Sequence, residues 1–184
     1  MQVLDNAKKI CISVIGSGDD ALNPQIAKIA NEVGREIASR GAVLICGGLG
    51  GVMAEAAKGA KENGGLTIGI LPGEDTGSAN PFIDIALPTG LGFARNVLVA
   101  YSGDAVIAIS GRLGTLSEIS YALLKKKPVI GIHTWNLEQL SGRMPPFDEQ
   151  SYINSVVMCE NAEEAVDKAF AIIENREKIK NGTN

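Results

Sequence analysis

The sequence is poor in the residues that hold metals and form disulfides. It has one histidine and three cysteines, and no two cysteines form a CxxC pair. Structural and catalytic metal sites usually draw several ligands from these residue types, so we expect no metal site. Cys11 and Cys46 lie in apolar runs, and we expect them to be buried free thiols in a reducing compartment.

Excess positive charge and long hydrophobic runs are also absent. The formal net charge is -4, with 17 basic and 21 acidic residues. This balance disfavours partners with a dense negative charge, such as nucleic acids and anionic membranes. No apolar run is long enough to cross a membrane, and the opening stretch MQVLDNAKKI is too polar for a signal peptide. We therefore expect a cytoplasmic protein.

What the chain does contain is aliphatic residues and glycine. Of its 184 residues, 45% are hydrophobic but only 4% are aromatic, and 22 are glycine. This length and composition predict a single domain, 1–184, whose core of about 10–175 is built from Ile, Val, Leu and Ala. We expect residues 176–184 to be a frayed tail.

Short apolar runs alternate with helical patterns along the chain. The predicted strands are 10–15, 42–46, 66–71, 82–87, 104–109, 128–133 and 153–159. Helices are expected between them, one starting at Asn23-Pro24, one over 92–101, and a last one capped by Asn161 and Glu164. Stretches 72–81 and 134–150 look irregular. Continuously apolar strands separated by helices predict an α/β fold: a doubly wound, mostly parallel, Rossmann-like sheet with helices on both faces.

In such sheets, ligands bind beyond the carboxyl ends of the strands. This rule selects the loops 16–19, 47–51, 72–75, 110–114 and 133–135. His133 ends a predicted strand there and could contact a ligand. Glu74 and Asp75 are expected to be solvated.

Two of these loops place several glycines between a buried strand and a helix start. The segment 47–51 reads GGLGG, and the segment 110–115 reads SGRLGT. Glycine lets the backbone approach a ligand, and a helix start offers unpaired N–H groups to an anion. Both loops could therefore hold a phosphate, although a tight strand-to-helix turn also explains GGLGG. Gly16-Ser17-Gly18 fits plain turn chemistry as well.

Arg95 and Glu118 are the charged candidates near these loops. The predicted topology places the start of the Arg95 helix close to the 110–114 turn, where an arginine could pair with a phosphate or cap a neighbouring loop. Thr115 and Glu118 have the spacing of a capping box, with Thr115 as the N-cap. Glu118 could instead face a ligand, and the two roles can coexist.

The segments GGLGGVMAEAAKGA (47–60), GFARNVLVAYSGDAVIAISGRLGTLSE (92–118) and KPVIGI (127–132) resemble the Lonely Guy family. That family shares a superfamily with sequences labelled "possible lysine decarboxylase". The resemblance implies a homo-oligomer, a dimer or a tetramer. For the enzymes of the family it implies hydrolysis of the N-glycosidic bond of nucleoside 5′-monophosphates. Arg95 would then orient the nucleotide, and Glu118 would act on the sugar and the water at C1′.

The sequence departs from the family signature, an Arg-Lys pair followed by PGGxGTxxE. Asn96 replaces the lysine, Ser110 the proline and Arg112 the second glycine. Arg112 could contact a phosphate or fill the pocket. The stretch 64–96 resembles a sister branch that includes the molybdenum cofactor carrier proteins, which bind a phosphorylated pterin without transforming it. No lysine lies in a recognisable pyridoxal-phosphate context, so lysine decarboxylation is not expected.

Three hypotheses follow. The first is a carrier or binding protein for a phosphorylated small molecule, a nucleotide or the molybdenum cofactor. The second is a phosphoribohydrolase with Arg95 and Glu118 as catalytic residues. The third is a pocket that serves only as a scaffold for assembly. The predicted ligand-binding residues are Gly16, Ser17, Gly18, Gly47, Gly48, Gly50, Gly51, Val52, Met53, Pro72, Arg95, Asn96, Ser110, Gly111, Arg112, Leu113, Gly114, Thr115 and Glu118.

Overall fold

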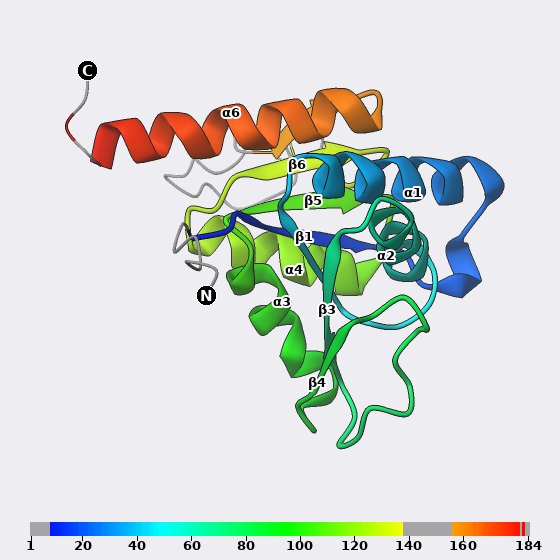
Figure 1. The fold of residues 1–184 in the computed structure, drawn as a ribbon. Coiled ribbons are helices and arrows are strands. Elements are labelled where there is room, and N and C mark those ends of the chain that lie inside the picture. The colour runs from blue at the N-terminus through cyan, green and yellow to red at the C-terminus, as the bar shows by residue number, and fades with distance from the viewer. Residues whose placement is uncertain (1–7, 138–155, 181, 183–184) are drawn as a thin grey trace, which may run out of the picture.

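The computed structural model describes residues 8–137, 156–180 and 182. These residues contain seven strands, which form one parallel sheet in the order β4-β3-β2-β1-β5-β6-β7 (Figure 1). The strands are β1 (Cys11–Gly16), β2 (Val43–Cys46), β3 (Leu66–Leu71), β4 (Ile85–Pro88), β5 (Ala105–Ile109), β6 (Val129–Ile132) and β7 (Val156–Cys159). All six pairings are parallel, so the predicted doubly wound α/β class is confirmed.

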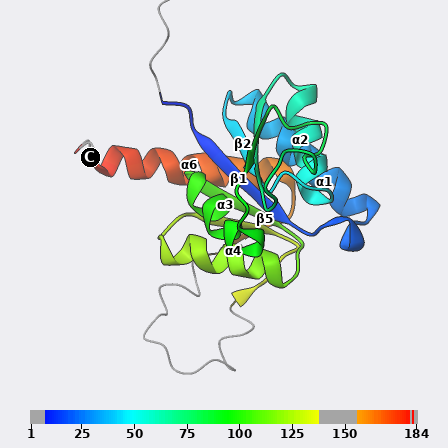
Figure 2. The same ribbon diagram turned by 90° about the horizontal axis from the view of Figure 1, so that it is seen from below.

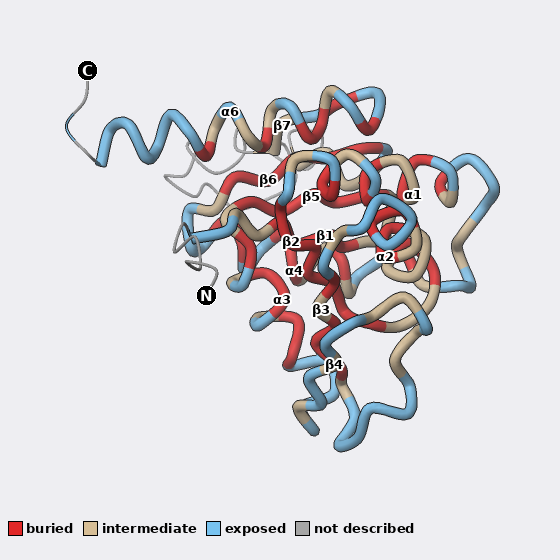
Figure 3. The backbone as a smooth tube through the Cα atoms, in the orientation of Figure 1, coloured by how far each residue is buried: buried red, intermediate tan, exposed pale blue. Residues whose placement is uncertain are grey.

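Helices cover both faces of this sheet, as Figures 1 and 2 show. On one face lie α1 (Pro24–Ser39), α2 (Val52–Glu62) and α6 (Ala162–Lys180), and on the other α3 (Asn96–Ser102) and α4 (Leu113–Leu124). Each face has its own aliphatic cluster. One includes Ile12 and Ile173, and the other includes Val106 and Ile119. Figure 3 shows the buried strands between the exposed outer surfaces of the helices. The low aromatic content is therefore compatible with two well-filled aliphatic layers.

Local capping signals predicted two helix starts correctly. The Asn23 carboxamide oxygen accepts a hydrogen bond of 2.9 Å from the Ile26 N–H, and Pro24 is the first residue of α1. The Asn161 oxygen accepts one of 2.9 Å from the Glu164 N–H at the start of α6. That helix continues to Lys180, so the prediction of a frayed tail is wrong for 176–180. Residues 138–150 of the predicted irregular stretch and 153–155 of the last predicted strand lie outside the described residues.

Two other elements differ from their predicted bounds by more than one residue at an end. β4 was expected over 82–87 but begins at Ile85. Just before it, side chains add to a backbone bond in which the Asp84 N–H donates to the Thr67 carbonyl at 3.2 Å. The Thr67 hydroxyl donates to the Phe82 carbonyl at 2.6 Å, and the Asp84 carboxylate accepts from the Thr67 N–H at 3.0 Å. The helix predicted over 92–101 begins as a 3₁₀ turn, η2 (Gly92–Arg95), and continues as α3 to Ser102.

Cys46 is fully buried and Cys11 is half-buried. Both are free thiols, and so is Cys159. No helix among the described residues combines the length and the apolar character needed to cross a bilayer. The cytoplasmic location stays a prediction.

Candidate functional site

A cavity of about 380 Å³ opens at the carboxyl edge of the sheet, where β1 and β5 lie side by side. The chain moves outward from β1 to β4 and then returns to β5 on the other side of β1, so this is the point where the strand order reverses. Ligands of open α/β sheets bind at such a reversal. The end of β1, the residue after β2, the η2–α3 junction and the first turns of α4 all line the cavity.

Eleven of the predicted ligand-binding residues line this cavity: Gly16, Ser17, Gly18, Gly47, Met53, Arg95, Asn96, Arg112, Gly114, Thr115 and Glu118. The others are not part of its lining: Pro72, and Gly48, Gly50, Gly51, Val52, Ser110, Gly111 and Leu113, which lie close in sequence to lining residues. Nor is His133, which is exposed. Five further lining residues were not predicted from the sequence: Val14, Ile15, Asp20, Leu49 and Phe93. Asp20 follows the segment 16–19, and Phe93 stands two residues before Arg95, so only their neighbours signalled them.

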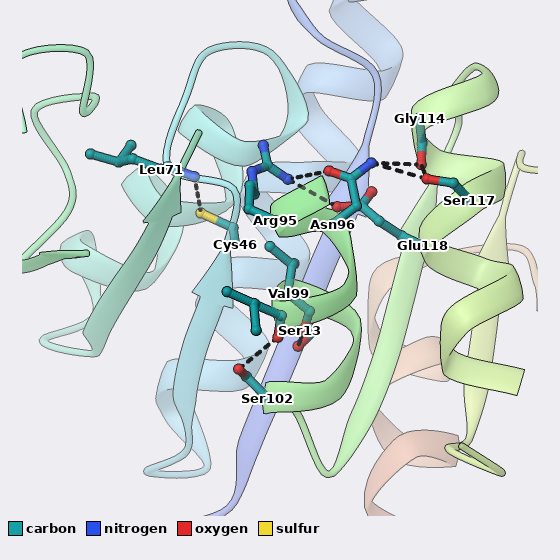
Figure 4. A network of polar contacts seen from close by, with 12 residues as sticks. Ser13, Cys46, Leu71, Arg95, Asn96, Val99, Ser102, Gly114, Ser117 and Glu118 are labelled. Atoms are coloured by element: carbon teal, nitrogen blue, oxygen red, sulfur yellow. Dashed lines mark hydrogen bonds and ion pairs between the residues drawn. The ribbon is translucent and has the colours of Figure 1, made fainter. Parts of the chain in front are cut away.

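Arg95 lies in the wall of the cavity, buried to all but 7% of its surface. Its Nη1 donates hydrogen bonds to the Glu118 carboxylate at 3.2 Å and to the Asn96 carboxamide oxygen at 2.7 Å (Figure 4). The Asn96 Nδ2 in turn donates to the Ser117 hydroxyl at 3.0 Å. Arg95 is therefore not a surface arginine that caps a loop, and Asn96 holds together η2 and α4.

Glu118 does not form the predicted capping box. α4 begins at Leu113, three residues earlier than expected, with Arg112 as an N-cap that makes no side-chain bond. Thr115 is consequently inside the first turn, and its side chain lies against Gly111, where a Cβ would collide with it. The Glu118 carboxylate, one turn later, meets the buried guanidinium of Arg95 instead of a backbone N–H, and an ionised partner gives the stronger hydrogen bond.

Burial changes the acid–base behaviour of Glu118. Removal of the carboxyl from water raises its pKa from the ordinary value to about 7, while the charge and the hydrogen bond of Arg95 act in the opposite direction. The net shift is upward because desolvation is the larger effect. Near neutral pH, Glu118 therefore exists in both protonation states inside the cavity.

Two polar atoms in the cavity wall are buried without a hydrogen-bond partner among the described residues. They are the Nε of Arg95 and the hydroxyl of Ser17, whose residue is 2% exposed. Each unsatisfied atom of this kind costs about 1–3 kcal/mol. Such atoms are rare in folded proteins, and a bound ligand is one of the usual reasons for them. Both residues line the same cavity, which makes it the candidate binding site.

The glycines of the GGLGG loop have a structural explanation that needs no ligand. The Gly51 N–H donates to the Asp19 carboxylate at 2.7 Å, and the Val52 N–H donates to the Ser17 carbonyl at 2.9 Å. A Cβ on Gly51, whose φ is +68°, would collide with the backbone of Ser17 and Gly18. The Asp19 side chain thus already occupies the start of α2. Of these four glycines only Gly47 lines the cavity, and ligand binding by this loop stays a prediction.

Arg112 and Asp20 form an ion pair at the mouth of the cavity. Their side chains are 64% and 68% exposed, so Arg112 does not fill the pocket. The Arg112 carbonyl accepts from the Leu116 N–H at 2.9 Å and from the Trp135 indole at 3.2 Å, which fixes the backbone at the start of α4. The guanidinium itself is largely exposed and is paired with Asp20.

No group of three or more His, Cys, Asp or Glu side chains in the described part of the chain is arranged to hold a metal ion. The cavity lining instead offers the guanidinium of Arg95, the Glu118 carboxyl of raised pKa, hydroxyls and the start of a helix. This set suits an anion better than a cation.

The model of the SLOG cluster4 family matches residues 9–166, and the chain belongs to that family. The fold is similar to a molybdenum cofactor binding protein from the phototrophic bacterium Rippkaea orientalis, with a TM-score of 0.81 and 39% identity over 91% of this chain and 99% of that one. It is also similar to the molybdenum cofactor carrier protein of Chlamydomonas reinhardtii, with a TM-score of 0.77 and 34% identity over 91% and 99% of the two chains. An uncharacterized protein of Archaeoglobus fulgidus is 46% identical over 125 residues, 68% of this chain and 81% of that protein. The resemblance noted from the sequence is confirmed.

Proposed function

We propose that this protein binds a phosphorylated small molecule of the molybdenum cofactor kind in the β1–β5 cavity and carries it without transforming it. The observation that carries the proposal is the buried Arg95, whose Nε has no hydrogen-bond partner among the described residues, in the wall of a cavity of about 380 Å³. Ligand pockets usually measure about 300–1,000 Å³, so a compact cofactor suits this one. The names of the two similar proteins supply the ligand class.

The residues suggest how such a ligand would be held. Its phosphate would accept hydrogen bonds from Arg95, from the Ser17 hydroxyl and from the first N–H groups of α4 near Gly114 and Thr115. The exposed Arg112 would add charge at the mouth. The pterin would bring the metal-binding sulfurs, and these protein groups would orient it and exclude water.

Retention of the ligand tests this proposal. Protein incubated without oxygen with the cofactor released from a donor enzyme should keep a stoichiometric amount of pterin through gel filtration. The pterin is detected as its fluorescent oxidation product after heat treatment. Albumin carried through the same steps is the control for nonspecific adsorption. If the folded protein retains no more pterin than albumin does, the carrier proposal is wrong.

The hydrolase hypothesis is the second candidate, because the raised pKa of Glu118 suits a general base near neutral pH. Glycosidic hydrolysis commonly needs two carboxyl groups, one to activate water and one to protonate the leaving group. Asp20 is the other carboxylate in the described lining, and it is paired with Arg112 at the mouth. The site therefore has no evident acid for a departing base, which favours the carrier.

We therefore expect no free base from AMP or other nucleoside 5′-monophosphates incubated with the wild-type protein. Chromatography of the products measures this, and Glu118→Gln is assayed in parallel. Release of base by the wild type that disappears in Glu118→Gln would contradict the carrier proposal and make the protein a phosphoribohydrolase. Release that persists in the variant would point to a contaminating enzyme.

The predicted homo-oligomer belongs to the same proposal. Leu98 of α3 and Leu124 of α4 are 38% and 66% exposed, on the two helices that cover the same face of the sheet. Apolar side chains grouped on one face favour a contact between copies of the chain. Whether the assembly is a dimer or a tetramer is measured by light scattering.

A further inference from the structure

Phe93 lines the cavity and is nevertheless 88% exposed. Among the lining residues in the described part of the chain it is the only aromatic one. Only 4% of the whole sequence is aromatic, and an exposed phenylalanine forgoes the burial that usually stabilises it. A ring in this position is therefore better explained by something that covers it than by the stability of the free protein.

The backbone around Phe93 is tightly held. The Gly92 N–H donates to the Pro72 carbonyl at 3.0 Å, and the Gly90 N–H donates to the Gly73 carbonyl at 2.8 Å. Gly90 and Gly92 have φ values of +66° and +52°, which glycine adopts without strain. These bonds attach the segment to the loop after β3. The exposure of Phe93 is thus a consequence of an ordered turn, which directs the ring toward the mouth.

The same turn also supplies Arg95 to the interior of the cavity. Within four residues, η2 presents an exposed ring and a guanidinium that is buried against Glu118. An elongated ligand with a flat ring at one end and a phosphate at the other would match both. The other apolar lining residues are Val14 and Ile15 of β1, and Leu49 and Met53, which follow β2. Leu49 and Met53 can contact the second face of a ring.

We propose that Phe93 is the stacking surface for the planar heteroaromatic ring of the ligand, whose phosphate binds at Arg95; this inference rests on the proposed function. Stacking depends on a π face and not on a pattern of hydrogen bonds, so it tolerates different rings. Phe93 therefore selects phosphates that carry a flat ring, pterin or purine, over sugar phosphates without one.

The test compares two kinds of ligand on four proteins. The ligands are an oxidised pterin with a phosphomonoester side chain and ribose 5-phosphate, both titrated by calorimetry. The proteins are wild type, Phe93→Ala, Phe93→Tyr and Leu91→Ala. Leu91 is a matched control, because it is 50% exposed in the same segment but does not line the cavity. We expect Phe93→Ala to weaken pterin phosphate binding about tenfold or more and to leave ribose 5-phosphate unchanged. Phe93→Tyr and Leu91→Ala should both bind like the wild type.

Each contrary outcome has its own meaning. Equal loss of both ligands in Phe93→Ala, or no loss of either, overturns the stacking role while the proposed function stands. If Phe93→Ala changes only the oligomeric state on gel filtration, the ring belongs to a contact between copies and the inference is wrong. If the wild type binds neither the pterin phosphate nor, in a third titration, AMP, the proposed function fails and the inference fails with it.

Discussion

Arg95→Ala is expected to weaken binding of a pterin phosphate by about 100-fold or more. The guanidinium is the one buried cation in the described cavity lining, and a phosphate bound beside it loses a charge-assisted hydrogen bond when it is removed. Arg95→Lys should give an intermediate affinity, because an ammonium keeps the charge but not the planar fork of donors. Calorimetric or fluorescence titration measures both.

The control for Arg95→Ala is Arg35→Ala. Arg35 is exposed and lines a separate groove that shares no residue with the cavity, so this variant should bind the ligand like the wild type. Circular dichroism and thermal unfolding establish that each variant is folded. Wild-type affinity in a folded Arg95→Ala protein would remove Arg95 from the site.

The second large effect concerns the pH dependence of stability. The pKa of Glu118 is raised in the folded protein to about 7 by burial, against 4.5 for the exposed group. Between these two values the folded state binds more protons than the unfolded state, so the free energy of unfolding falls as the pH rises. For this group alone the fall is about 3 kcal/mol from roughly pH 4 to pH 8. Stability from Glu118 is therefore complete below its unfolded pKa and lost above the folded one.

Glu118→Gln should remove this component, since a carboxamide does not titrate. Urea unfolding at a series of pH values should show a wild-type curve that declines relative to the variant as the pH rises toward 8. Glu163→Gln, on the exposed first turn of α6, should keep the wild-type profile. Parallel curves for the wild type and Glu118→Gln would show that burial does not raise the pKa of Glu118.

The sequence was enough to predict the features that depend on near neighbours in the chain. Apolar runs such as 105–109 became buried strands because a parallel sheet covered on both faces admits little else. Asn23 and Asn161 cap their helices because the N–H groups that they satisfy lie three residues away. The order of strands and helices, together with the handedness of their connections, then placed the cavity at the carboxyl edge.

Tertiary structure decided which partner each polar group of the site finds. Thr115 and Glu118 have a local capping pattern, but Arg95, 23 residues earlier, is a charged partner in a place without water, and the carboxylate pairs with it. The four glycines of GGLGG look like a phosphate loop until Asp19, 32 residues earlier, is seen to accept the Gly51 N–H. Arg95 and Asp19 both lie far in sequence from the groups that they bind, and they meet these groups only when the strands assemble. Short-range patterns therefore predict helices and strands well. The hydrogen bonds of a buried polar site depend on the folded arrangement instead, because a group removed from water pairs with the strongest partner within reach.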